Sequence, residues 1–139
     1  MSWQELTAAY IDTSLVGSGH IDKASIISVA GDSTWATTPD FAVGADEIKT
    51  LIAILNDPDK QDGPAVKKAF EEGIHVAGER YVATRVEEGH VYGRKGKTGI
   101  CIVKTKQAIL IGHYGENVQA GNATQTVEAL ALYLTGLGY

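Results

Sequence analysis

The second half of the sequence contains short apolar segments that are separated by links of only a few residues. Each segment is rich in β-branched or aromatic residues, and the links carry glycine or charged residues, as in Gly96–Gly99. Short strands joined by such short links indicate an antiparallel meander. The sequence predicts its strands at 74–76, 81–86, 90–94, 100–103 and 108–111.

The first part of the chain predicts a helix followed by a hairpin. Ser2 and Glu5 form an S-x-x-E capping box for the helix, and Gly17–Gly19 ends it. The apolar segment 24–29 and the segment 34–37 then pair as two strands, with a glycine-containing turn between them.

Helical patterns also interrupt and follow the strands. The segment 45–55 has apolar residues at helical spacing, and a short helix is predicted at 64–70, where a proline can occupy the first turn. A last helix is predicted to begin near Asn122, which is a good N-cap residue. The apolar stripe of this last helix consists of Ala123, Val127, Leu130, Leu134 and Leu137.

The elements thus follow the order helix, hairpin, helix, meander, helix. This order predicts an α+β fold in which a central antiparallel sheet is packed between helices. The chain has 139 residues and no linker, repeat or low-complexity segment. We therefore expect a single domain over 1–139.

Composition limits the functional classes that are open to the chain. The net charge is -5, which argues against a general nucleic-acid-binding protein. A single cysteine, Cys101, permits no internal disulfide, and the sequence begins without the pattern of a secretory signal. No apolar run is long enough to span a bilayer. These features predict a cytoplasmic protein, which we expect to be a monomer.

No set of residues predicts a catalytic or metal site. The four histidines show no metal-ligand spacing, and we interpret His75 and His113 as structural residues of strands. The segment Gly96-Lys97-Thr98 resembles the end of a phosphate-binding loop, but it joins two strands, so we interpret it as a hairpin turn. We expect no catalytic residue, no metal and no cofactor, and hence no enzyme.

Aromatic residues are concentrated near the two ends of the chain. Trp3 and Tyr10 share one face of the predicted first helix, Trp35 lies in the hairpin, and Tyr133 and Tyr139 lie at the other end. Tryptophan and tyrosine suit a groove for proline-rich peptides, whose polyproline II conformation is already formed before binding. The alternative interpretation is that these residues belong to the core.

Several short motifs in order resemble one known family. They are Ser2-Trp3-Gln4, Ala9-Tyr10-Ile11-Asp12, Ala30-Gly31-Asp32-Ser33-Thr34-Trp35-Ala36, Tyr92-Gly93-Arg94, Lys104-Thr105-Lys106-Gln107 and Ala131-Leu132-Tyr133-Leu134-Thr135-Gly136-Leu137-Gly138-Tyr139. Together they resemble profilin, of the fungal type, over nearly the whole chain. Each motif is weak alone, and the six in this order are specific.

The resemblance implies a regulator of actin polymerisation with two ligand faces. It implies that the N- and C-terminal helices pack together on one face of the sheet and carry a site for proline-rich segments of actin nucleation and elongation factors. By position, this polyproline site would consist of Trp3, Tyr10, Trp35, Tyr133, Leu134 and Tyr139.

The resemblance places monomeric actin on the later strands and on the start of the last helix. The matching positions are Arg80, Arg85, Tyr92, Arg94, Lys104, Val118, Gln119, Gly121, Asn122, Gln125 and Glu128. The four cationic residues in this set can form a positive patch that attracts an acidic partner. The alternative is an ordinary solvated strand face. The same patch could bind inositol phospholipids at a membrane surface, as the family implies.

Two segments depart from the family pattern. Glu5–Ala8 is an apparent insertion in the first helix, which separates Trp3 from Tyr10 by seven residues. The inserted four residues turn the tyrosine by about 40° and move it by about 6 Å along the helix. The segment 57–73 is longer than we expect and could alter the rim of the actin face.

Other modules share this layered build. A PAS-like or roadblock-like sensor or scaffold domain without actin binding remains the main alternative. It would need an internal ligand cavity or a dimer interface, and it would not bind polyproline.

Overall fold

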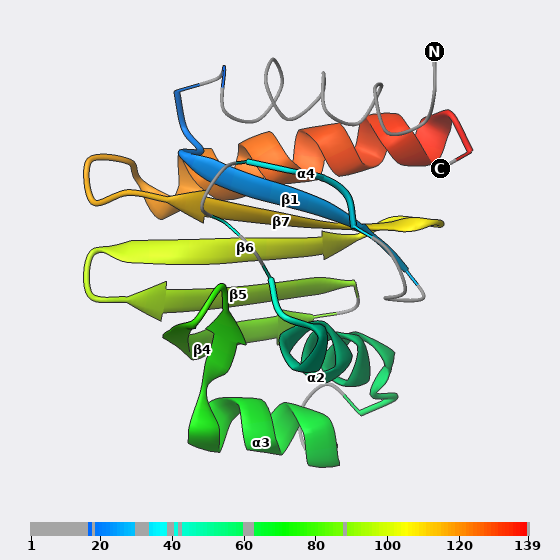
Figure 1. Cartoon of the computed structure of the whole chain (residues 1–139), viewed down its shortest axis with the longest axis vertical. Helices are drawn as coiled ribbons and strands as arrows, with labels where there is room; N and C mark the ends of the chain where they lie inside the picture. Colours follow the sequence, from blue (N-terminus) through cyan, green and yellow to red (C-terminus); the bar gives the residue numbers. More distant parts are fainter. Residues whose placement is uncertain are drawn as a thin grey trace.

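The computed structural model describes residues 17, 19–29, 34–38, 41, 43–59, 63–87 and 89–138. The predicted first helix, with Trp3, Tyr10 and the segment Glu5–Ala8, lies outside the described residues, as does Tyr139. Within the described part of the chain, residues 23–114 supply the strands of one sheet, and three helices pack against it (Figure 1).

The described strands form one seven-stranded sheet in which each reported pairing is antiparallel. Their order in the sheet is β2-β1-β7-β6-β5-β4-β3, so the predicted meander from β3 to β7 is confirmed. The last strand of the meander, β7, pairs with β1 of the β1–β2 hairpin. The strands are β1 (Lys23–Ser28), β2 (Thr34–Thr37), β3 (Ile74–Val76), β4 (Glu79–Glu87), β5 (His90–Lys95), β6 (Thr98–Lys104) and β7 (Ala108–Tyr114).

The described helices lie on opposite sides of this sheet. α4 (Ala120–Gly136) packs across β6 and β7, whereas α2 (Ala45–Asn56) and α3 (Pro64–Glu72) pack against each other and against β3 and β4. Figure 1 shows α4 at the top of the molecule and α2 and α3 at the bottom, with the strands between them. The predicted α+β arrangement, a sheet packed between helices, is confirmed.

Strand alternation divides the apolar side chains between two cores. Along β6, Ile100 and Ile102 enter the core on the α2 and α3 side, and Cys101 and Val103 enter the core beneath α4. Every one of these four side chains is buried. A residue's position in its strand therefore decides which face of the sheet it serves.

The segment 57–73 is built around a buried aspartate. Asp57 ends α2, and its carboxylate accepts hydrogen bonds from the backbone N–H groups of Asp59, Ala65 and Val66 at 3.0–3.3 Å. Two of these donors belong to the first turn of α3, whose own N-cap, Gly63, has no side chain to accept them. Asp57 thus caps α3 from eight and nine residues away.

The last helix begins earlier than the sequence predicts. Gln119, and not Asn122, is the N-cap of α4, and its carbonyl accepts hydrogen bonds from the N–H groups of Asn122 and Ala123. No side chain caps this end, so the preference of asparagine for N-caps did not decide the boundary. The predicted apolar stripe is also wrong at Leu137, which is half exposed beyond the helix, while Ala131 is buried instead.

Candidate functional site

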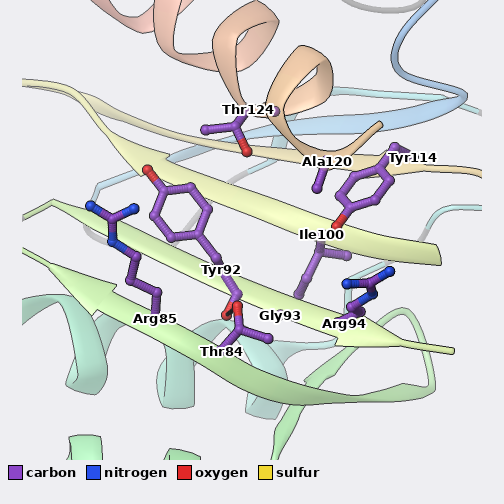
Figure 2. A pocket seen from close by; sticks show the side chains of 10 residues that line it. Thr84, Arg85, Tyr92, Gly93, Arg94, Ile100, Tyr114, Ala120 and Thr124 are labelled. Atoms are coloured by element: carbon purple, nitrogen blue, oxygen red, sulfur yellow. Dashed lines mark hydrogen bonds between the residues drawn. The ribbon is translucent and has the colours of Figure 1, made fainter. Parts of the chain in front are cut away.

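Among the described residues, no helix lies over the α4-side face of β4 and β5. α4 covers β6 and β7, and the same face of β4 and β5 stays open beside the start of α4. There a cavity of about 310 Å³ lies between the two strands and the helix. Figure 2 shows its side chains: Arg85, Tyr92, Arg94 and Tyr114 come from the sheet, and Thr124 comes from α4. We call this cavity and its rim the strand-side face.

Local sequence explains why the cavity is open. β4 has an irregular register between Ala83 and Arg85, which brings Arg85 opposite Tyr92 on the neighbouring strand. Gly99 lies opposite Tyr114, and a Cβ atom at Gly99 would come within 2.2 Å of the Tyr114 hydroxyl. The glycine therefore leaves room for the Tyr114 side chain beside β6.

Tyr92 connects the sheet to α4. Its hydroxyl donates a hydrogen bond of 2.5 Å to Oε1 of Glu128, and the guanidinium carbon of Arg85 lies 5.8 Å from the centre of its ring. Burial, together with this hydrogen bond, raises the pKa of Tyr92 above its ordinary value. The phenol therefore stays protonated and remains a donor to Glu128.

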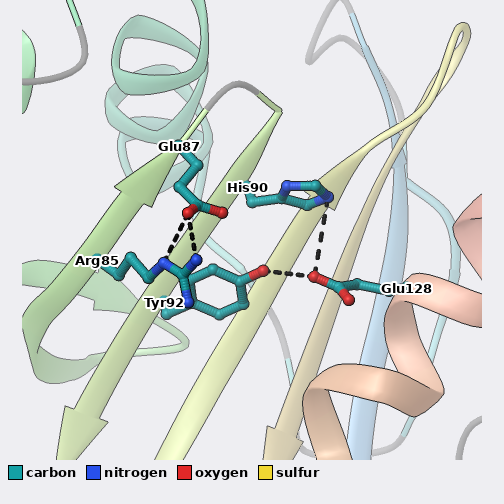
Figure 3. Close-up of polar contacts among 5 residues, drawn as sticks. All are labelled: Arg85, Glu87, His90, Tyr92 and Glu128. Carbon is teal, nitrogen blue, oxygen red and sulfur yellow. Dashed lines mark hydrogen bonds and ion pairs between the residues drawn. The ribbon is translucent and has the colours of Figure 1, made fainter. Parts of the chain in front are cut away.

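His90 extends this network from the same strand face (Figure 3). Its Nε2 lies 3.9 Å from Oε1 of Glu128, and its ring stacks beside that of Tyr92 at 6.2 Å between centroids. The sequence interpretation gave His90 no role in binding. Its spacing of two residues from Tyr92 on one strand could have placed it on the same face.

The charges of the strand-side face are partly matched within the protein. Nε of Arg85 donates a hydrogen bond of 2.7 Å to Oε1 of Glu87, and the two side chains also form an ion pair. Nε of Arg94 donates to the carbonyl of Gly96 at 3.1 Å, within the hairpin turn that the sequence predicts. These contacts orient the two guanidinium groups, and the exposed Arg85–Glu87 ion pair adds little stability.

The structure places two of the four cations of the predicted patch away from the cavity. Nε of Arg80 donates to the carbonyl of Glu72 at the end of α3, at 2.7 Å. Lys104 extends to the opposite side of the sheet, where its Nζ donates to Oδ1 of Asn56 at the end of α2, at 3.3 Å. Strand alternation explains this placement, because Lys104 pairs with Ile109, a residue of the α2-side core. Of the four cations, Arg85 and Arg94 line the cavity.

The remaining predicted actin residues lie at or just before the start of α4. Gln119, Gly121, Asn122 and Gln125 are exposed, and Gly121 also lines the cavity. Val118 is half buried and packs against the core beneath α4.

The predicted polyproline residues divide between described and undescribed parts of the chain. Tyr133 is 54% exposed on α4, and the neighbouring Leu132 and Leu137 are 76% and 50% exposed. Leu134 is fully buried, so it packs beneath this surface and offers no contact to a ligand. Trp3, Tyr10, Tyr139 and the side chain of Trp35 lie outside the described residues.

The other titratable groups have structural surroundings. Cys101 is buried beneath α4, and burial raises the pKa of its thiol to about 12. Nδ1 of His113 lies 2.5 Å from Oδ1 of Asp22, and its ring packs against Phe41 and Tyr81. In the described ranges, no helix is both long and apolar enough to cross a membrane.

Comparison with known proteins gives a consistent result. The family model described as Profilin matches residues 1–139. The profilin of Schizosaccharomyces pombe is 45% identical over 139 residues, with both chains fully covered. The crystal structure of Acanthamoeba castellanii profilin II superimposes with a TM-score of 0.85 at 41% identity, covering 99% of this chain and all of the other.

Two more distant structures share the fold. Mouse profilin IIa, solved with a double repeat from the FH1 domain of mDia1, has a TM-score of 0.73 at 17% identity and covers both chains fully. The LokiProfilin2 chain of a complex with rabbit actin has a TM-score of 0.76 at 19% identity and covers 99% of each chain. From the full-length family match and the 45% identity, the chain belongs to the profilin family.

Proposed function

We propose that this chain is a non-enzymatic regulator of actin polymerisation in the cytoplasm, which binds monomeric actin and proline-rich peptides on separate faces. Family membership supports the proposal, as do two proteins of the same fold whose structures contain rabbit actin and an FH1 repeat. The strand-side face would take actin. The exposed surface around Tyr133 would take the peptide.

The separation of these surfaces along α4 is the observation that carries the proposal. Gly121 lines the cavity near the start of the helix, and Tyr133 is exposed twelve residues later. Twelve residues advance about 18 Å along an α-helix and rotate by about 120° around its axis. A ligand on one surface therefore leaves the other accessible.

The chemistry of each surface suits its proposed ligand. Arg85 and Arg94 give the strand-side face positive charge on a chain of net charge -5, which favours an acidic protein partner and fixes its orientation. Tyr133 presents an aromatic face with a hydroxyl at its tip, the combination that recognises proline rings and peptide carbonyls. Holding both ligands at once raises the effective concentration of actin near a growing filament end.

The proposal is tested by reversing one charge. Arg85→Glu places a second carboxylate beside Glu87, so actin should no longer co-purify, while retention on a polyproline column should match that of the wild type. Lys49→Glu is the matched control, because it makes the same charge change on exposed α2. Loss of both ligands in Arg85→Glu, or of neither, would contradict two separate faces.

Inositol-phospholipid binding stays a prediction. Arg85 and Arg94 share the cavity, but Arg80 and Lys104 reach the ends of α3 and α2. Dispersed cations attract an anionic membrane less than a cluster does. Co-sedimentation with vesicles that contain a phosphoinositide, compared with neutral vesicles, measures this binding directly.

A further inference from the structure

We infer that His90 is a positioning residue of the strand-side face, and that its protonation strengthens actin binding by holding Glu128 and, through it, Tyr92. This inference rests on the proposed actin binding. It adds His90, which is not among the actin-binding residues that the resemblance implies, and it makes actin affinity depend on pH.

The geometry places His90 and Tyr92 as two donors around one carboxylate. The Tyr92 hydroxyl donates to Oε1 of Glu128, and Nε2 of His90 lies 3.9 Å from the same oxygen (Figure 3). Both donors come from β5, and Glu128 comes from α4. The cluster is therefore the polar joint between the open strands and the helix that forms the wall of the cavity.

Charged groups from β4 and α4 lie around this joint. β4 supplies Glu87, which is paired in register with His90, and Arg85, whose charge lies over the Tyr92 ring. On β6, Lys104 follows Val103, the register partner of His90, but its Nζ extends to the other side of the sheet and donates to Asn56. From α4, Glu128 lies within ion-pair distance of the histidine ring. The Glu128 carboxylate of α4 thus lies within ion-pair distance of His90, while the Glu87 carboxylate of β4 is paired with Arg85.

The sign of the pH effect follows from these contacts. Histidine takes up a proton between pH 8 and pH 5, a range in which an ordinary carboxylate is still ionised. Protonated His90 carries a donor on both ring nitrogens and attracts the Glu128 carboxylate, while the Tyr92 phenol keeps its own proton. The carboxylate is then held by two donors, and the face gains one positive charge beside Arg85.

The size of the effect is that of a half-exposed ion pair. The side chains of His90 and Glu128 are 33% and 40% exposed, so solvent screens their attraction. Actin should bind about two- to fivefold more tightly at pH 6.0 than at pH 7.5. An imidazole that merely fills space would give no such ratio.

The first experiment needs no actin. NMR of the free protein should show the Tyr92 ring signals moving with pH through the histidine range in the wild type. They should stay constant in His90→Asn, which keeps a polar side chain of similar size but cannot become charged. Tyr92 signals that do not move in the wild type, or that move equally in His90→Asn, would overturn the coupling.

The second experiment measures actin affinity at pH 6.0 and pH 7.5 for wild type, His90→Asn and Glu128→Gln with the same actin. The ratio of affinities should fall to that of actin's own pH dependence in both variants. A wild-type ratio that persists in His90→Asn would overturn the inference. If the wild type binds no actin at either pH, the proposed function fails, and the NMR titration still decides whether His90 controls the joint.

Discussion

Gly121→Ala should stabilise the protein and weaken its binding to actin. Gly121 lies in the first turn of α4, and a Cβ atom added there would meet no heavy atom within 4 Å. Its φ angle is not in the left-handed region, so alanine fits the existing backbone. The same methyl group would project at the rim of the cavity, where the family resemblance places actin.

The substitution should raise the free energy of unfolding and lower the affinity for actin. Replacing a helical glycine with alanine stabilises a protein by about 0.4–1 kcal/mol, because the unfolded chain loses conformational freedom. For a domain of this size, the melting temperature should rise by about 1–5 °C. A methyl group forced into a packed interface costs about 1–3 kcal/mol, so the actin dissociation constant should rise by about fivefold or more.

Gly136→Ala is the matched control for this pair of measurements. Gly136 lies at the other end of α4, and it too has no heavy atom within 4 Å of an added Cβ. It should give a similar gain in thermal stability with unchanged actin affinity. Thermal unfolding measures the stability of both variants, and actin titration measures their affinity for actin. Unchanged actin affinity in a stabilised Gly121→Ala would refute the placement of actin at this rim.

Three further perturbations test the fold around the site. Asp57→Ala leaves buried N–H groups of α3 without their acceptor and should lower the free energy of unfolding by about 2–4 kcal/mol in urea denaturation, whereas an unchanged value would refute the capping role. Gly112→Ala should lower it by about 1–3 kcal/mol, because its Cβ would lie 2.8 Å from Val127 and push α4 from the sheet; a stability within experimental error of wild type would argue against this close packing. Burial raises the pKa of the Cys101 thiol from 9.0 to about 12, so the unfolded chain releases this proton first and the free energy of unfolding falls as pH rises above about 9. Between pH 8 and pH 10.5, Cys101→Ala should lose about 1–2 kcal/mol less of this free energy than the wild type. An equal loss in both proteins would contradict the shift.

The fold was predictable where local pattern and topology agree. The links between successive strands from β3 to β7 are too short for a crossover, so these strands must pair as antiparallel neighbours. The apolar spacing in 45–55 correctly predicts α2. The start of α4 was not predictable in the same way, because Gln119 caps it through its carbonyl alone. The role of Asp57 depends on a contact across eight residues, which no local pattern reveals.

The candidate site was predictable as a set of residues but not as an arrangement. The resemblance to profilin leads by position to Arg85, Tyr92 and Glu128, which the structure brings together at one joint. The predicted positive patch also included Lys104, although strand alternation turns it to the other face of the sheet. The membership in the profilin family also removes the PAS-like or roadblock-like alternative, which the order of elements alone left open.

The most direct test of two separate faces is a titration of actin in the presence and absence of a saturating polyproline peptide. The distance of about 18 Å along α4 between Gly121 and Tyr133 predicts the same actin affinity in both conditions, within about twofold. Analytical ultracentrifugation of the mixture should show a complex of protein, actin and peptide. Displacement of actin by the peptide would contradict the account.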